Sequence, residues 1–254
     1  MTIKIAVSNQ KGGVGKTDLC VNLASCLART GKKTLILDMD PQGSATDYLT
    51  SKKPEISTNE LLLDDSVNVK DIVLNTGIEN LFLAPGSSKL NAARVQLMSD
   101  IGMQFKLRKK LARLKSGEYD YIFMDTPPSL CQLTINALTA CDKVLIPVQA
   151  HYFAMDGVVK LINAINSIKE GINPKIEIAG IVLTMFDKRN RLSFEVEKNV
   201  RAAFKGKLFK TAIPVNVKLT ESPSHHKPII LYSNSCKGAK AYTELAKQFI
   251  KVIR

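Results

Sequence analysis

Short apolar runs at regular intervals are the feature that most narrows what this chain can fold into. They cover residues 3–7, 34–38, 80–84, 120–125, 143–148 and 176–184, and helix-length segments separate them. Most of the runs are nearly continuous in apolar residues rather than alternating. That pattern is typical of parallel strands that helices cover on both faces. The sequence therefore predicts an α/β fold with a doubly wound, mostly parallel sheet.

Helices are predicted between these strands and after them. The candidates are 17–29, which ends before a capping glycine at Gly31, then 103–115, 156–169, 191–205 and 238–252. The polar segment 50–75 is expected at the edge of the core, with little chemistry of its own. Neither a repeat nor a flexible linker interrupts the 254 residues. We therefore expect a single domain over residues 1–254.

The start of the chain and its cysteines bear on the cellular compartment. The chain has no run of about 18 apolar residues, and no charged and apolar leader precedes the first strand. Its five cysteines are never spaced C-x-x-C, which argues against a disulfide framework or a zinc site. We expect buried thiols in a cytoplasmic protein.

A glycine-rich segment, "QKGGVGKT" at 10–17, joins the first predicted strand to the first predicted helix. In the pattern G-x-x-x-x-G-K-[ST], Gly15, Lys16 and Thr17 fit, but Gln10 occupies the first glycine position. Glycines allow successive backbone N–H groups to face phosphate oxygens at a helix N-terminus. Lys16 is suited to the β and γ phosphates and the Thr17 hydroxyl to Mg²⁺. The segment predicts a nucleotide phosphate site.

Several motifs together resemble one protein family. The loop K-G-G-x-G-K-T at 11–17, "LILDMDPQGSAT" at 35–46 and "YDYIFMDTPPSL" at 119–130 resemble the deviant P-loop ATPases of the ParA/Soj and MinD superfamily. The later segments "LTMFDKRNRLS" and "IPVNVKLTESPSHHKPIILY" narrow the resemblance to ParA/Soj, and it covers nearly the whole chain. It implies a P-loop NTPase fold, ATP and Mg²⁺ as cofactors, weak intrinsic ATP hydrolysis and a homodimer that sandwiches ATP.

The resemblance also implies roles for individual residues. Lys11 is expected to cross the dimer interface to the partner's nucleotide, as an arginine finger does elsewhere. Asp40 is expected to orient the attacking water, with Asp38 as a supporting acceptor, while Thr17 and Asp125 hold the metal. Lys11, Lys16 and Asp40 form the catalytic set. The nucleotide contacts are Lys11, Gly12, Gly13, Val14, Gly15, Lys16, Thr17 and Asp18, with Pro214 and Asn216 at the adenine near Met185.

Positive charge is concentrated in the last quarter of the chain. The formal net charge is +13, and residues 186–254 contain 15 Lys and Arg against five Asp and Glu. Such a patch attracts phosphate polyanions or acidic lipid, although it is also what a solubilising surface looks like. The resemblance implies nonspecific binding of double-stranded DNA, with Arg189 and Lys218 at the positions of DNA-binding arginines. It further implies a ParB-like adaptor that stimulates hydrolysis and a location on the nucleoid.

Two other functions compete with a DNA-segregation ATPase. The last helix places basic residues beside Leu245, Phe249, Val252 and Ile253, so a MinD-like, membrane-associated ATPase is one alternative. Ala241, Leu245 and Phe249 form an ordinary core-facing stripe, however, so we expect no stable membrane association. A degenerate scaffold that binds nucleotide or DNA without hydrolysis is the other alternative.

Two residues depart from the family pattern. Asp18 stands where relatives carry Thr or Ser, and a carboxylate about 4 Å from a phosphate costs up to roughly 4 kcal/mol. Weakened ATP binding or slow hydrolysis is expected unless Asp18 turns away and leaves only its N–H at the phosphate. His226 stands where relatives often carry glycine, and a positive φ there is tolerated poorly by histidine.

Overall fold

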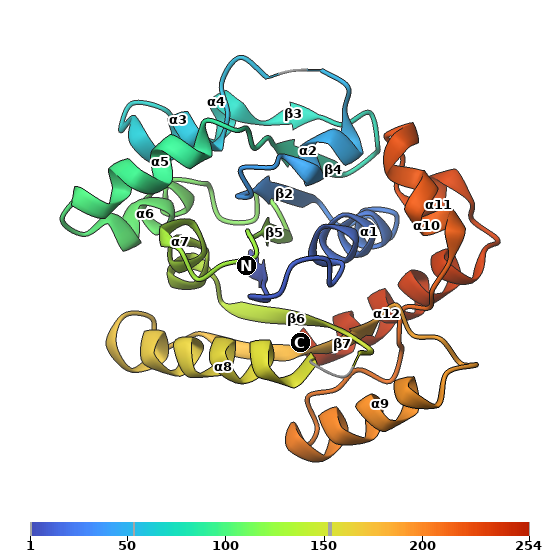
Figure 1. Cartoon of the computed structure of the whole chain (residues 1–254). Coiled ribbons are helices and arrows are strands. Elements are labelled where there is room, and N and C mark those ends of the chain that lie inside the picture. The colour runs from blue at the N-terminus through green and yellow to red at the C-terminus, as the bar shows by residue number, and fades with distance from the viewer. Residues whose placement is uncertain (1, 53, 152–153, 254) are drawn as a thin grey trace.

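The computed structural model describes residues 2–52, 54–151 and 154–253, and within them the strands form one seven-stranded sheet. The strand order is β3-β4-β2-β5-β1-β6-β7, and all neighbours are parallel except the short pair β3 and β4. Figure 1 shows helices on both sides of it. The strands are β1 (Ile3–Val7), β2 (Thr34–Asp38), β3 (Leu74–Asn75), β4 (Leu81–Ala84), β5 (Tyr121–Asp125), β6 (Lys143–Gln149) and β7 (Glu177–Thr184). The predicted fold class is confirmed.

The helices range from single turns to five turns. The α-helices are α1 (Lys16–Ala28), α2 (Ser44–Leu49), α3 (Thr58–Leu63), α4 (Val69–Ile72), α5 (Leu90–Gln96), α6 (Lys106–Ala112), α7 (Gln132–Ala140), α8 (Ala154–Gly171), α9 (Arg191–Ala203), α10 (Val217–Glu221), α11 (Ile229–Tyr232) and α12 (Lys237–Ile253). The 3₁₀ helices are η1 (Leu97–Ser99), η2 (Met103–Phe105) and η3 (Ser222–His225).

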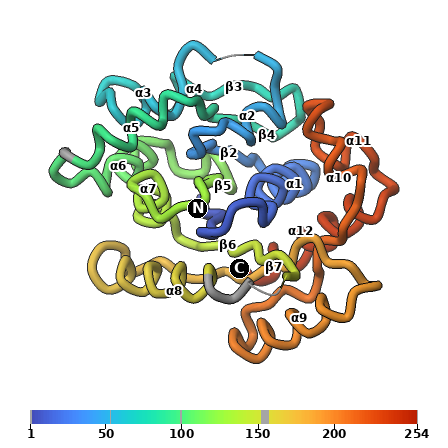
Figure 2. The backbone as a smooth tube through the Cα atoms, in the orientation of Figure 1, coloured from blue at the N-terminus to red at the C-terminus, as the bar shows by residue number. Residues whose placement is uncertain are grey.

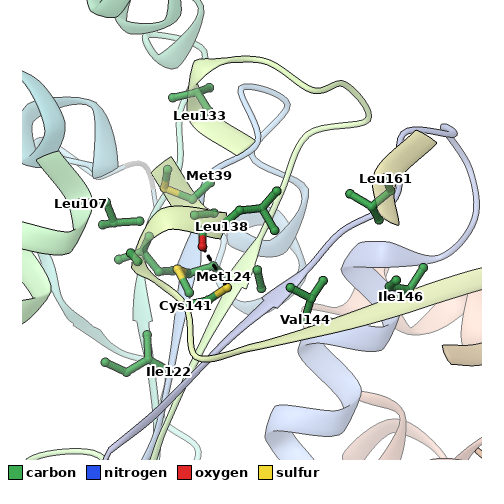
Figure 3. Close-up of a cluster of buried hydrophobic side chains, with 14 of the residues drawn as sticks. Met39, Leu107, Ile122, Met124, Leu133, Leu138, Cys141, Val144, Ile146 and Leu161 are labelled. Atoms are coloured by element: carbon green, nitrogen blue, oxygen red, sulfur yellow. Dashed lines mark hydrogen bonds between the residues drawn. The ribbon is translucent and has the colours of Figure 1, made fainter. Parts of the chain in front are cut away.

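Two hydrophobic layers enclose the sheet, one on each face. Helices α1, α11 and α12 pack on one face, and α6, α7 and α8 pack on the other, as the tube in Figure 2 makes clear. In the second layer Leu107, Leu133 and Leu161 reach from α6, α7 and α8 toward Ile122 and Val144 of the sheet (Figure 3). Because β1, β2 and β5 are covered on both faces, their residues are almost wholly apolar.

The strand register brings three chain segments to one edge of the sheet. Val7 and Asp38, which end β1 and β2, both lie beside Asp125 at the end of β5. The chain runs from β1 to one side of the sheet and returns later to place β6 on the other side of β1. Such a switch in direction opens a crevice at the carboxyl ends of parallel strands. The glycine-rich loop lies at this edge.

The predicted helix 103–115 is wrong in its extent. A 3₁₀ turn, η2, precedes α6, which ends at Ala112. Leu107 and Leu111 are buried as the helical spacing predicts, whereas Met103 and Leu114 are only partly buried against the same cluster.

The segment 50–75 is more than an edge decoration. It forms α3, α4 and the two-residue β3, and its Leu61, Leu62, Val69 and Ile72 are fully buried. These short apolar pieces belong to the core on the α6–α8 face. The helices are too short to show a helical period in the sequence.

Candidate nucleotide site

The glycine-rich loop has the backbone that a phosphate cradle requires. Gly13 and Gly15 have φ values of 71° and 78°, in the left-handed region that side chains disfavour. Gly15 precedes α1, and no described side chain caps the first turn of that helix. The first-turn N–H groups therefore point into the crevice without an internal acceptor, as in an anion-binding helix start.

Side chains from other strands hold this loop in place. The Thr184 hydroxyl, at the end of β7, donates to the Val14 carbonyl at 2.8 Å. Asn9 donates through Nδ2 to the Pro147 carbonyl at 2.7 Å and accepts the Lys11 N–H at 3.0 Å. The loop is thus fixed at both ends before any ligand binds.

Lys16 is buried, with only 7% of its surface exposed. Its Nζ donates to the Lys11 carbonyl at 3.1 Å, so the ammonium bends back across the loop. Burial lowers the pKa of Lys16, while the nearby carboxylates of Asp125 and Asp40 oppose that shift. An ammonium beside two carboxylates leaves a local excess of negative charge, so a divalent cation is needed there before a phosphate can approach Lys16 favourably.

Thr17 and Asp125 meet as the sequence predicts. The Thr17 hydroxyl donates to Asp125 Oδ2 at 2.7 Å. Asp125 is fully buried, and its Oδ1 has no hydrogen-bond partner among the described residues. Burial and then the charge of Asp38 raise the pKa of Asp125 well above its usual value. A hydroxyl and an unpartnered buried carboxylate oxygen are hard oxygen donors, which fit Mg²⁺.

Asp38 and Asp40 have different surroundings. Asp38 is fully buried and accepts the N–H and hydroxyl of Thr46 at 2.9 and 2.7 Å and the Asp40 N–H at 3.1 Å. Asp40 is 8% exposed and accepts the Gln42 N–H at 3.0 Å. Asp38 therefore organises the turn that carries Asp40. The role of Thr46 could not be predicted from the sequence, because a lone threonine in a helix has no diagnostic pattern.

A cavity of ≈ 440 Å³ opens beside the loop. Gly15, Met185, Pro214 and Asn216 line it, as expected for the adenine contacts. Asn216 Oδ1 is buried and has no partner among the described residues, so it is a free acceptor for a donor on a ligand. Met185 has a φ of 51°, a strained value for a side chain with a Cβ. The cavity joins the phosphate loop to the predicted adenine region.

The Asp18 side chain lies on the wall of this cavity rather than at solvent. Burial raises the pKa of Asp18 to about 6, although a hydrogen bond with Tyr48 opposes part of this shift. The Tyr48 hydroxyl also contacts Asn22 Nδ2 at 3.1 Å and the Ser222 hydroxyl at 2.6 Å. The Asp18 carboxylate therefore lies beside Tyr48 of α2, while Asp18 still lines the cavity. Sequence reasoning missed this network because Tyr48 and Ser222 are distant from Asp18 in the chain.

His226 adopts the backbone conformation that its position in the family predicts. Its φ is 51° and its ψ is 37°, which is left-handed. The ring Nδ1 lies within hydrogen-bond distance of the Asp47 carbonyl, so the side chain ties η3 to α2. This contact offsets part of the strain that histidine has at positive φ.

The two candidate DNA-binding residues are exposed and paired. Arg189 contacts Asp187 through Nε and Nη2, at 3.0 and 2.9 Å. Lys218 Nζ contacts Glu221 at 2.9 Å. The side chains are 89% and 50% exposed, respectively. Both cations therefore face solvent, as DNA binding requires, but a carboxylate from the same segment accompanies each.

The last helix packs as a core helix. Leu245 and Phe249 of α12 are fully buried, and Ile253 is 7% exposed, whereas Val252 is 54% exposed. Most of the apolar residues proposed for a membrane anchor are therefore occupied in the core. Within the described ranges, no helix is long and apolar enough to span a bilayer.

The cysteines are free thiols in the part of the chain that the structure describes. Cys20, Cys26 and Cys141 are buried, and Cys131 and Cys236 are partly buried. The expectation of buried thiols thus holds for three of the five.

Known proteins resemble this chain along almost its whole length. The family model described as AAA domain matches residues 2–178. The sporulation initiation inhibitor protein Soj of Bacillus subtilis (strain 168) is 45% identical over 246 residues, covering 96% of each chain. The chromosome partitioning protein ParA of Myxococcus xanthus (strain DK1622) is 43% identical over 249 residues, 97% of this chain and 87% of that protein.

A solved structure supports the fold. Cobyrinic acid a,c-diamide synthase from Mycobacterium smegmatis, with bound ADP and magnesium, is 31% identical and has a TM-score of 0.86. It covers 99% of this chain, which covers 95% of it. The sequence identity to Soj and ParA is higher, and it extends beyond the phosphate loop to the C-terminal segments. The chain belongs to the ParA/Soj family of chromosome-partitioning ATPases.

Proposed function

We propose that the chain binds ATP with Mg²⁺ at residues 11–17 and hydrolyses it. The observation that carries this proposal is the contact of Thr17 with Asp125 at the uncapped start of α1. Thr17 and the free Oδ1 of Asp125 would hold Mg²⁺, directly or through its water. The metal would neutralise charge on the phosphates during transfer. We propose Mg²⁺ as the metal because the site offers oxygen donors.

The chain's own residues supply the remaining steps. Lys16 is placed to leave the Lys11 carbonyl and contact the β and γ phosphates, where its charge stabilises the transferring group. Asp40, held by the turn that Asp38 organises, orients the attacking water. Lys11 reaches the partner's nucleotide once two subunits close on ATP. Hydrolysis then depends on dimerisation.

The base and its sugar occupy the adjoining cavity. Pro214 and Met185 offer apolar surface to the adenine, and Asn216 Oδ1 accepts a hydrogen bond from its exocyclic amine. Gly12, Gly13, Val14 and Gly15 provide backbone to the phosphates.

The cellular role that we propose is DNA segregation. The relatives are named for chromosome partitioning, and the basic C-terminal part supplies cations for DNA phosphates. The ATP-bound homodimer binds DNA without sequence preference, with Arg189 and Lys218 among its contacts, and associates with the nucleoid. A ParB-like adaptor bound to the cargo DNA stimulates hydrolysis and release.

Duplex binding tests this role most directly. A labelled duplex of mixed sequence is titrated with protein in ATP, in ADP and without nucleotide, at several salt concentrations. Binding that requires ATP and falls steeply with salt supports segregation. DNA binding that is equal with ATP, with ADP and without nucleotide supports the nonhydrolytic scaffold. Binding to liposomes in place of DNA supports the MinD-like alternative.

Asp18 makes the intrinsic activity weak in this proposal. Its carboxylate lies close to Gly15 of the phosphate loop, where a nucleotide's negative phosphates would approach it. Replacing Asp18 with threonine removes that repulsion, so we expect tighter ATP binding or faster turnover. Asp18→Asn is the matched control for charge at nearly constant shape. Equal ATP affinity and turnover in wild type and Asp18→Thr, measured side by side, would refute this part.

A further inference from the structure

Arg189 is neutralised from within its own loop. It lies in the connection from β7 to α9, at the right-hand side of Figure 1. Its guanidinium forms a two-point contact with the Asp187 carboxylate, and its backbone N–H donates to Asp187 Oδ1 at 2.9 Å. The pKa of Asp187 is about 2, because hydrogen bonds from the Arg189 side chain and backbone stabilise the charged form. The ion pair is therefore present at neutral pH.

The same arrangement recurs at Lys218. Its ammonium contacts Glu221 at 2.9 Å, and the Glu221 carboxylate also accepts the Tyr232 hydroxyl at 2.8 Å. Lys218 Nζ also lies 5.7 Å from the centre of the Tyr232 ring. Glu221 is thus held by two partners and stays beside the cation. Each expected DNA contact carries its own counter-charge.

A DNA phosphate needs the same donors that these carboxylates occupy. Arginine binds carboxylate and phosphate with the same pair of parallel N–H groups, so Asp187 and a phosphate compete for Arg189. When phosphate displaces Asp187, the freed carboxylate gathers a cation from solution. The contact then releases fewer net counterions than a free arginine would. Such pairs lower both the affinity and its salt dependence.

We propose that Asp187 sets the strength of DNA binding by holding Arg189 as an internal ion pair that a DNA phosphate must displace. Glu221 acts on Lys218 in the same way. Asp187 is a positioning residue here, because it touches no DNA itself. This inference rests on the proposed DNA-binding function.

The test measures duplex binding by the full chain with a non-hydrolysable ATP analogue across a salt series. Asp187→Asn keeps an oxygen for the Arg189 backbone but removes the charge. We expect roughly two- to fivefold tighter binding, the range of an exposed ion pair. The salt dependence should also steepen by up to about one phosphate contact, a slope change near 0.9.

A matched control is available one turn away. Arg191 pairs with Glu195 at 3.1 Å, and both side chains are exposed. Glu195→Gln adds the same charge to the protein without freeing Arg189. An equal gain of affinity in Glu195→Gln would show that net charge alone acts, and it would overturn the proposal.

A double-mutant cycle separates this inference from the function on which it rests. In an Arg189→Ala background, the gain from Asp187→Asn should vanish, because no guanidinium remains to be released. If the gain persists there, the proposal is wrong although DNA binding stands. If the wild type binds no duplex with any nucleotide, both the proposal and the segregation function fail.

Discussion

Helices α1 and α3 differ in what satisfies the backbone N–H groups of their first turns. At α3 the Ser57 side chain accepts the Asn59 N–H, and Glu60 accepts the Ser57 N–H at 2.8 Å in a capping box. At α1 no described side chain caps the turn, and the helix starts from Gly15 in a left-handed conformation. The start of α3 is therefore satisfied by its own side chains, whereas the start of α1 leaves its N–H groups for a ligand.

The charged groups near the two helix starts also differ: the charged form is stabilised at α3 and destabilised at α1. Glu60 is stabilised in its ionised form, and Lys89 pairs with it at 3.0 Å. Around α1, burial shifts the pKa values of Lys16, Asp18 and Asp125 toward their neutral forms. A region held in this way gives up stability that a bound nucleotide and metal can restore. The helix start at the candidate nucleotide site is therefore the less stable of the two.

Removal of Lys16 should have the largest effect. Lys16→Ala takes away the charge that we propose to face the transferring phosphate, so we expect ATP turnover to fall at least about 100-fold. Turnover is measured with and without DNA, and circular dichroism checks the fold. Lys89→Ala, at the capped helix start, removes a lysine of equal charge and should leave turnover unchanged. A similar loss in both variants would contradict the assignment.

Removal of magnesium should have the next largest effect. Excess chelator should remove Mg²⁺ from its proposed ligands Thr17 and Asp125, so ATP affinity should fall by at least about tenfold. Calorimetric titration with and without Mg²⁺ measures the change. Thr17→Ala should already show most of the loss in the presence of Mg²⁺. If Thr17→Ala retains full magnesium dependence, the metal lies elsewhere.

Replacement of Asp18 should have a smaller effect, which is on the stability of the nucleotide-free protein. Its pKa is raised to about 6, so the ionised form that dominates at neutral pH opposes folding. Asp18→Asn retains an acceptor for Tyr48 and removes the charge. We expect the free energy of unfolding to rise by roughly 1–2 kcal/mol, allowing for partial exposure. Urea denaturation without nucleotide measures it, and a loss of stability would show that the charge is favourable there.

The sequence predicted the six longer strands well because most of the apolar runs are nearly continuous and helix-length segments separate them. It also placed Thr17, Lys16 and Asp125 together, since a strand, a glycine loop and a helix leave little choice of geometry. It missed α2, α7 and the two-residue β3, which have no period to detect. The Asp18 network and the ion pair of Asp187 depend on side-chain directions, which spacing does not encode.

Substitution of Glu60 at the capped start of α3 should have the smallest effect on stability, and that effect should depend most clearly on pH. Burial alone would raise the pKa of Glu60, but hydrogen bonds from Lys89, Ser57 and the backbone lower it to about 2. Because the pKa of Glu60 in the folded protein lies below its ordinary value of 4.5, this stabilisation is fully present above pH 4.5. It is lost as the pH falls toward 2. Glu60→Ala should therefore cost about 1 kcal/mol at neutral pH.

Chemical denaturation of wild type and Glu60→Ala between about pH 7 and pH 3 follows this loss, and the difference between the two proteins should shrink across the range. Glu60→Gln, which keeps the hydrogen bond to the Ser57 N–H without the charge, should cost about half as much. ATP turnover should be unchanged in both variants, since α3 lies outside the nucleotide crevice. A constant difference at every pH would mean that packing rather than charge makes the contribution of Glu60, and α3 would then not be the charge-satisfied counterpart of α1.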